Sequence, residues 1–138
     1  MLLRFTLTQP ADVVFGYLAD PQKFVSVHPV IAKIESLRAD RYRVYETLKV
    51  GRLPFSFTYL ATFAPDPAGK TVRIDATVFG LTRIAMAFRV FSQDGKTVVE
   101  EEVSFRSVLP VKPVMEKVFR EQHHRLFQNI ENVGLKTA

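Results

Sequence analysis

The chain contains no cysteine and no tryptophan among its 138 residues. Without cysteine it can form no disulfide and use no thiol nucleophile, and cysteine usage cannot indicate the redox compartment. The apolar run Leu2-Leu3 ends at Arg4, so it is too short for the apolar region of a signal peptide. No run approaches the roughly 18 apolar residues that span a bilayer. We therefore expect a cytoplasmic protein without a membrane span.

Runs of one charge are missing as well. Nineteen Lys and Arg residues against 14 Asp and Glu residues give a net charge of +5, and the basic residues occur singly or in twos. We interpret them as a solvated basic surface, with a weak general attraction to RNA, ribosomes or anionic membranes as the alternative. We expect no specific nucleic-acid partner.

Catalytic and cofactor signatures are also absent: there is no GxGxxG, P-loop, HExxH or GxSxG motif. The three histidines lack ligand spacing, and His28 beside Pro29 is typical of a helix end. The run Glu100–Glu102 is not a metal cluster, because neighbours on a strand point to opposite faces. Salt bridges to Arg83 or Arg89 are the favoured use of its outer pair. The sequence indicates no metal and no cofactor.

What the chain does have is twelve phenylalanines within a hydrophobic content of 47%. A length of 138 residues is usual for one domain, so we expect residues 1–138 to form a single domain. A domain of this size buries roughly two-thirds of its unfolded surface. Bulky rings in this number can fill a large core or line a cavity within it.

The hydrophobic pattern changes twice along the chain. Residues 2–8 alternate as in a strand, residues 10–19 have helical spacing with Thr8 or Gln9 at the cap position, and a second short helix ends before Pro29. Residues 30–109 then alternate almost throughout, which indicates about six strands joined as hairpins, with Asp94-Gly95 as one tight turn.

The last segment, residues 110–133, predicts a long amphipathic helix. Phe119, Leu126 and Ile130 lie within roughly 20° of one direction on it. The predicted fold is α+β: a curved antiparallel sheet of about seven strands wrapped around the long C-terminal helix, with two short helices after the first strand. Such a helix-grip arrangement predicts a pocket between sheet and helix.

The segment PADVVFGYLADP at residues 10–21, the hairpin strands after it, and a last helix ending in LFQNIENV carry a family resemblance. In these features the chain resembles the START/Bet v1-like superfamily, also grouped as SRPBCC and including polyketide cyclases and coenzyme Q-binding proteins. The likeness covers nearly the whole chain and implies the helix-grip fold. It also implies a role with lipids, sterols, quinones, polyketides or plant hormones. Without a Rieske-type motif, the chain resembles the simple one-domain members.

Polar residues on the concave face are the informative ones, because burial is costly unless they are partnered. Glu46 and Glu101 share faces with apolar neighbours and can place a carboxylate of raised pKa in the cavity. The alternatives are a carboxylate at the cavity mouth, an Arg partner, or a register slip that turns it outward. Tyr59 is either a hydrogen-bond donor to a ligand or a core residue with its hydroxyl near an edge.

The adjacent histidines His123 and His124 are not a pair, because neighbours on a helix diverge by about 100°. His123 lies about 40° and Gln122 about 60° from Phe119 at the centre of the buried face, whereas His124 lies about 140° away and is expected in solvent. His123 is either a histidine bonded at the edge of the core or a residue that meets Glu46, Glu101 or Tyr59 and contacts the ligand.

The expected cavity combines the inward residues of the sheet with the inner face of the last helix. Its predicted lining residues are Glu46, Phe57, Tyr59, Ile74, Met86, Phe88, Glu101, Val103, Met115, Phe119, Gln122, His123 and Leu126.

Three functions remain open. We favour a binding or carrier protein for a hydrophobic small molecule, such as a lipid, quinone or polyketide-like compound, and assign no catalytic residue. The alternatives are an aromatase/cyclase-type enzyme, with Glu46, Glu101, Tyr59 or His123 as acid or base, and a ribosome- or protein-interaction module. Both cavity functions need a space of at least roughly 300 Å³. The sequence identifies neither the ligand nor the oligomeric state.

Overall fold

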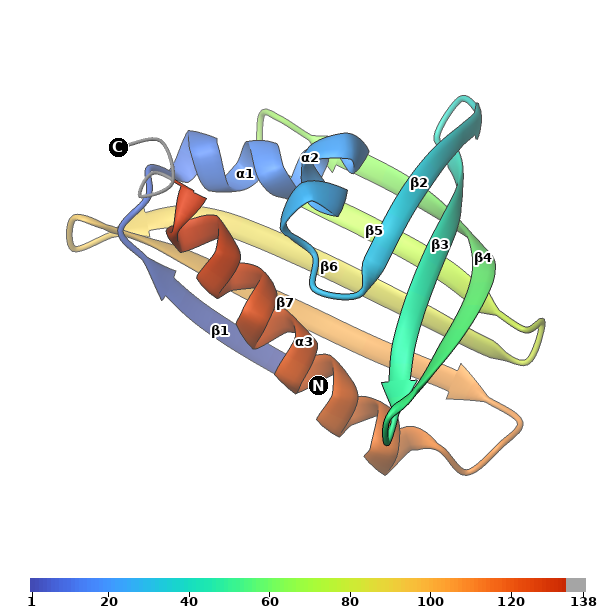
Figure 1. Ribbon diagram of the computed structural model, residues 1–138. Coiled ribbons are helices and arrows are strands. Elements are labelled where there is room, and N and C mark those ends of the chain that lie inside the picture. Colours follow the sequence, from blue (N-terminus) through green and yellow to red (C-terminus); the bar gives the residue numbers. More distant parts are fainter. Residues whose placement is uncertain (134–138) are drawn as a thin grey trace.

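The computed structural model describes residues 1–133, which form one seven-stranded antiparallel sheet and three helices (Figure 1). In chain order the elements are β1 (Leu2–Leu7), α1 (Ala11–Ala19), α2 (Pro21–Val27), β2 (Ile31–Arg38), β3 (Arg41–Val50), β4 (Leu53–Asp66), β5 (Thr71–Val78), β6 (Thr82–Gln93), β7 (Lys96–Ser107) and α3 (Lys112–Glu131). The predicted helix-grip fold is confirmed.

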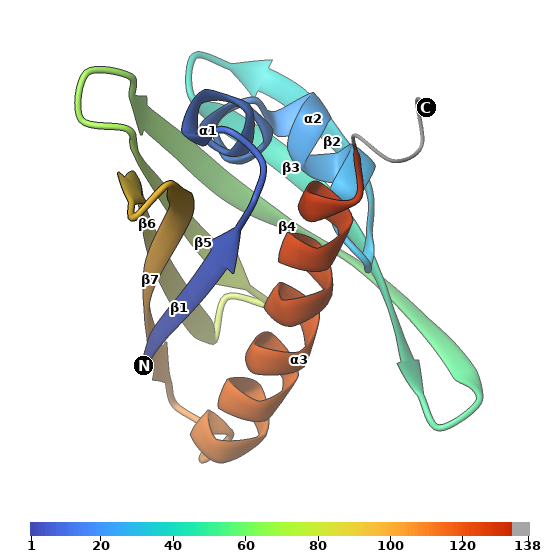
Figure 2. The same cartoon turned by 90° about the vertical axis from the view of Figure 1, so that its left-hand side faces the viewer.

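The strand order is β1-β7-β6-β5-β4-β3-β2, so every neighbouring pair except β1–β7 is a hairpin. The turn between β6 and β7 uses Asp94 and Gly95, both at positive φ (53° and 77°), as the expected tight hairpin requires. The sheet curves, and α3 runs across its hollow side (Figures 1 and 2). Period-two alternation places one apolar row of each strand on that side, where Val44, Ile74 and Val99 are buried.

The two short helices are fixed by different means. Asp20 caps α2, since its Oδ1 accepts from the backbone N–H of Gln22 at 2.9 Å and of Lys23 at 3.4 Å. Helix α1 has no side-chain cap, so the expected cap at Thr8 or Gln9 was wrong. Those two residues instead donate hydrogen bonds from their backbone N–H groups to the Glu131 carboxylate, at 2.9 and 3.1 Å.

This contact ties the C-terminal end of α3 to the start of α1. Burial would raise the pKa of Glu131, but the hydrogen bonds from Thr8 and Gln9 outweigh it and lower that pKa. Asn129 adds a bond from its Nδ2 to the carbonyl of Val27 at the end of α2, at 2.8 Å. Leu126 and Ile130 on the same half of the helix are fully buried.

The N-terminal half of α3 is held differently. Val114 is 65% exposed, and Met115 and Phe119 are only partly buried. The helix therefore packs tightly on the core at one end and stands away from the sheet at the other. No helix among residues 1–133 is long and apolar enough to cross a membrane.

Candidate ligand-binding cavity

A cavity of about 390 Å³ lies between the concave face of the sheet and the N-terminal half of α3. Strands β2 to β6 form one wall, α2 and its C-terminal end close one side, and the β7–α3 connection and α3 form the other wall. Its lining is mostly aliphatic and aromatic, and its volume is within the range of small-molecule sites. A hollow of this size exists because the phenylalanines line the space rather than fill it.

Nine of the thirteen predicted residues line this cavity. They are Glu46, Phe57, Tyr59, Ile74, Met86, Met115, Phe119, Gln122 and His123. The structure places the other four, Phe88, Glu101, Val103 and Leu126, in the solid core, each at most 1% exposed. They point inward as expected, but they lie where the C-terminal half of α3 leaves no space above the sheet.

Several lining residues were missed by the sequence reasoning. Phe55 and Phe63 belong to the same alternating row as Phe57 and Tyr59 on β4, so the pattern indicates their face, but the predicted lining did not include them. Phe79 and His28 also line the cavity. They lie in a turn and at a helix end, where no periodicity indicates which way a side chain points.

The most deeply buried polar contact joins α3 to β7. His123 Nδ1 lies 2.6 Å from Glu101 Oε1, and the two residues are 1% and 0% exposed. This contact occupies Nδ1 of the ring and leaves Nε2 as its other functional nitrogen. Within residues 1–133 no group hydrogen bonds to that Nε2, and His123 is part of the cavity wall.

Glu101 is incompletely satisfied. Its second oxygen, Oε2, is the one buried side-chain polar atom in the described part of the chain that has no hydrogen-bond partner. An unpartnered buried carboxylate oxygen is costly, and natural cores keep few of them. The contact therefore holds His123 in position at a cost to stability.

A second polar pair lies on the sheet, between β3 and β4. The hydroxyl of Tyr59 donates to Glu46 Oε1 at 3.0 Å. Burial, followed by the charge and hydrogen bond of Glu46, raises the pKa of Tyr59 well above 10, so the phenol keeps its proton. Burial also raises the pKa of Glu46, while the Tyr59 bond and nearby His123 lower it in part.

His28 completes the polar group. Its Nδ1 accepts from the backbone N–H groups of Val30 and Ile31, both at 3.2 Å. Burial, and then the neighbouring His123, lower the pKa of His28 to about 3. The ring is therefore neutral at pH 7, with its hydrogen on Nε2, and its centroid lies 6.3 Å from that of His123. His28 offers a hydrogen-bond donor that does not depend on pH in the physiological range.

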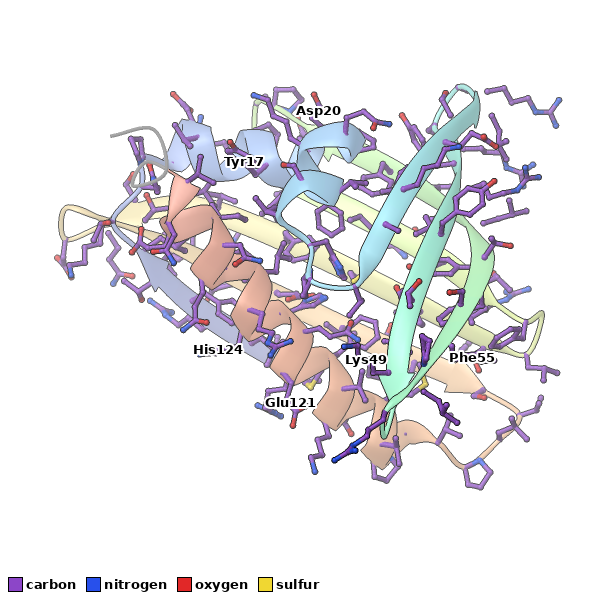
Figure 3. The ribbon with its side chains drawn as sticks, viewed as in Figure 1. Tyr17, Asp20, Lys49, Phe55, Glu121 and His124 are labelled. Carbon is purple, nitrogen blue, oxygen red and sulfur yellow. The ribbon has the colours of Figure 1, made fainter. Side chains whose placement is uncertain are left out.

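The neighbouring histidine behaves as expected: His124 is exposed, and Figure 3 shows it with Glu121 on the opposite side of α3 from Phe55. The salt bridge expected for the outer pair of the Glu100–Glu102 run is confirmed for Glu100, which forms ion pairs with Arg89 and with Arg4. It is wrong for Glu102, which has no ion pair within residues 1–133, and Arg83 is not used. Among residues 1–133, no group of three or more His, Cys, Asp or Glu side chains is placed to hold a metal ion.

Fold and cavity together define the class: an α+β helix-grip protein with a space of ligand size between its sheet and its C-terminal helix. A family model described as "Polyketide cyclase / dehydrase and lipid transport" matches residues 4–134, and the chain belongs to this family. No curated protein sequence matches the chain.

Solved structures with the same fold are only distantly related in sequence. Ara h 8.0201 has a TM-score of 0.79 at 16% identity, over 99% of this chain and 97% of that one. A START superfamily protein from Mycobacterium smegmatis has a TM-score of 0.78 at 14% identity, over 100% of this chain and 98% of that one. The di-domain ARO/CYC BexL from the BE-7585A biosynthetic pathway has a TM-score of 0.81 at 17% identity, over 97% of this chain and 47% of that one. At such identities the likeness shows the fold alone.

The Glu101–His123 contact gives a stability prediction. Glu101→Ala leaves a buried imidazole without its partner, so we expect a loss of about 3–5 kcal/mol in the free energy of unfolding, measured by urea denaturation. Glu101→Met combined with His123→Leu removes both polar groups and should recover stability to within about 1 kcal/mol of the wild type, or exceed it. Glu102→Ala, on the exposed face, is the control and should change little. A double variant as unstable as Glu101→Ala would contradict a net cost of the pair.

The lowered pKa of His28 gives a prediction on pH. Between the ordinary value of 6.5 and the folded value of about 3, the unfolded chain binds a proton that the folded chain does not, so acidification through this window destabilises the fold. His28→Asn keeps an acceptor for the Val30 and Ile31 amides but cannot titrate. Its unfolding free energy should therefore fall less steeply with acid, by up to about 1.4 kcal/mol per pH unit. His124→Asn should keep the wild-type slope, and equal slopes in all three proteins would refute the assignment.

Proposed function

We propose that the protein binds and carries a hydrophobic small molecule in the cavity beneath α3. The observation that carries this proposal is an apolar cavity of about 390 Å³ whose few polar residues include a polar cluster of His28, Glu46, Tyr59 and His123. A space of this kind suits a ligand that is mostly apolar and has one polar group. Membership in a family whose description includes lipid transport supports the same function.

The polar cluster supports a ligand with an oxygen at one end. His28 supplies a neutral N–H donor. The Nε2 atom of His123 has no hydrogen-bond partner among residues 1–133. The Tyr59 hydroxyl is already bonded to Glu46. A carbonyl or hydroxyl oxygen can accept from His28 without bringing a full charge into an apolar space, which would be costly. Quinone-like and ketone-bearing ligands satisfy this requirement.

Filling the cavity should abolish binding without unfolding the protein. Ala76 is buried on the cavity wall, and we expect Ala76→Phe to raise the dissociation constant of the neutral apolar fluorescent probe N-phenyl-1-naphthylamine at least tenfold, because the ring takes up the space. Native mass spectrometry of the purified wild type should show a co-purified apolar compound that the variant lacks. Ala87→Phe, on the exposed face of β6, is the matched control and should bind as the wild type does. Equal binding by both variants would contradict a ligand in this cavity.

A second function, acid–base catalysis of a cyclase type, is favoured by one observation. Glu101 orients His123 so that a second ring nitrogen remains free at the cavity wall, which is the arrangement of an oriented general base. Glu46, with its raised pKa, could exchange a proton on the opposite wall. The di-domain ARO/CYC protein BexL has the same fold, which is consistent with that alternative.

One experiment separates carrier from cyclase. A linear poly-β-ketone incubated with the protein should be recovered unchanged if the protein is a carrier, as we propose. Cyclised product that disappears in both Glu46→Gln and Glu101→Gln, while probe binding stays within about twofold of the wild type, would establish catalysis instead. Gln keeps the size and an acceptor oxygen at each position but cannot exchange a proton at neutral pH.

A further inference from the structure

The cavity opens at one end of the molecule, between three segments that we call the mouth segments. They are residues 47–56 around the β3–β4 turn, residues 78–83 around the β5–β6 turn, and residues 106–117 from the end of β7 into α3. Figures 1 and 2 show all three in the lower half of the molecule, at the end opposite α1 and α2. Phe55, Phe79 and Val114, one from each segment, line the cavity.

The mouth segments expose an unusual share of apolar side chains. Among the side chains that the structure describes, those of residues 1–49 and 51–133, eleven large hydrophobic ones are exposed. Seven of them lie in these segments: Leu53, Phe55, Phe79, Leu81, Val108, Leu109 and Val114. Leu53 and Val108 are 74% and 77% exposed, at the tips of separate loops. Exposed apolar groups gathered at one end of a fold indicate a contact surface.

The same segments hold all of the excess positive charge. They contain six of the 19 Lys and Arg residues, namely Lys49, Arg52, Arg83, Arg106, Lys112 and Lys117, but only Glu116 of the 14 acidic residues. Their formal charge of +5 equals the net charge of the whole chain, so the remainder is neutral. All six cations are exposed, and none has a carboxylate within 4 Å in the described residues.

We propose that the mouth is a docking surface for an anionic lipid bilayer. A bilayer surface has an outer layer of anionic headgroups and an inner layer of acyl chains. The unpaired cations of the mouth segments match the first layer, and the apolar side chains at the loop tips match the second. The side chains of Leu53 and Val108 enter the boundary of the acyl chains, while the cations remain among anionic headgroups. A nucleic acid would use the cations but not the aliphatic tips. A typical protein–protein interface has a continuous apolar centre, whereas the mouth presents three separate loop tips.

Docking in this orientation turns the cavity opening toward the membrane. A mostly apolar ligand could then pass between the acyl chains and the cavity without crossing water, which avoids the cost of exposing its apolar surface. The inference goes beyond the proposed function and does not depend on it, since the docking surface consists of side chains outside the cavity's polar cluster.

Vesicle flotation of the purified, ligand-free protein tests the proposal. We expect the protein to float with vesicles of phosphatidylcholine and phosphatidylglycerol at about 0.1 M salt, and at least tenfold less with phosphatidylcholine alone or at about 0.5 M salt, because salt screens the attraction. Ala76→Phe should float like the wild type, so a failure of ligand binding and a failure of docking are distinguishable.

Two pairs of variants locate the contact. Arg52→Glu with Lys112→Glu should lower the vesicle partition coefficient at least twentyfold, because each cation near an anionic surface contributes about fivefold. Its matched control, Arg38→Glu with Arg41→Glu, reverses two exposed charges at the β2–β3 turn, at the other end of β3. This control loses the same total charge, but it should retain binding within about threefold of the wild type, since its sites lie beyond a Debye length of the mouth.

A second comparison tests insertion of the apolar tips. Leu53→Ser with Leu81→Ser should weaken binding to anionic vesicles at least tenfold, because two apolar side chains no longer leave water. Leu37→Ser with Leu60→Ser changes two exposed leucines outside the mouth segments and should not weaken it.

The absence of tryptophan gives an independent readout. Leu53→Trp introduces a single indole at the mouth, and its fluorescence should shift to the blue on anionic vesicles and be quenched by lipids with brominated acyl chains. Leu60→Trp, on the exposed face of β4, should show neither change. The proposal is overturned if the wild type does not float, if the mouth variants and their controls float alike, or if brominated lipids leave Leu53→Trp unquenched.

Discussion

The fastening of α3 at its C-terminal end is the constraint on which the cavity depends. The Glu131 carboxylate accepts hydrogen bonds from the chain between β1 and α1, Asn129 donates to the end of α2, and Leu126 and Ile130 pack without exposure against the sheet. With one end fixed, the direction of a 20-residue helix is fixed as well. Toward the opposite end of the molecule the curved sheet diverges from the axis of α3. A space therefore opens beneath the N-terminal half of α3 without any special cavity-forming sequence. Backbone hydrogen bonds within α3 keep that half helical, although it has little packing beneath it.

The position of the polar groups follows from the same geometry. His123 lies where the tight half of α3 gives way to the open half, so its Nδ1 is sealed against Glu101 while its other side reaches the cavity wall. Glu46 with Tyr59, and the neutral His28, come from other elements to the same region. A buried carboxylate with one unpartnered oxygen lowers stability. Polar groups that cost stability and gather at the wall of an apolar space are better explained by what the space binds than by what the fold needs.

The sequence predicted most of the fold because the signals were periodic. Alternation on every strand, a single apolar face on α3 and a tight turn at Asp94-Gly95 each limit the chain to one local structure. The candidate site was predicted less completely. Period two gives the face on which Phe88, Glu101 and Val103 lie, but not how far along the strands the helix stays in contact, so these residues belong to the core. Turn and helix-end residues such as Phe79 and His28 have no periodicity at all. The Thr8 and Gln9 prediction failed because a partner more than 120 positions away, Glu131, took the place of the helix cap.

The location of the positive charge is a second feature that the sequence pattern did not predict. Along the sequence the basic residues are scattered in ones and twos, and a solvated surface is the natural interpretation of that pattern. The antiparallel topology brings alternate turns to one end of the sheet, so the β3–β4 turn, the β5–β6 turn and the β7–α3 connection share an end although they are separated in sequence. Most of the acidic residues are elsewhere, many in ion pairs, and what remains at the mouth is unpaired positive charge among exposed apolar tips. A modest net charge of +5 therefore acts as a local field at the entrance to the cavity and not as a diffuse property of the whole surface.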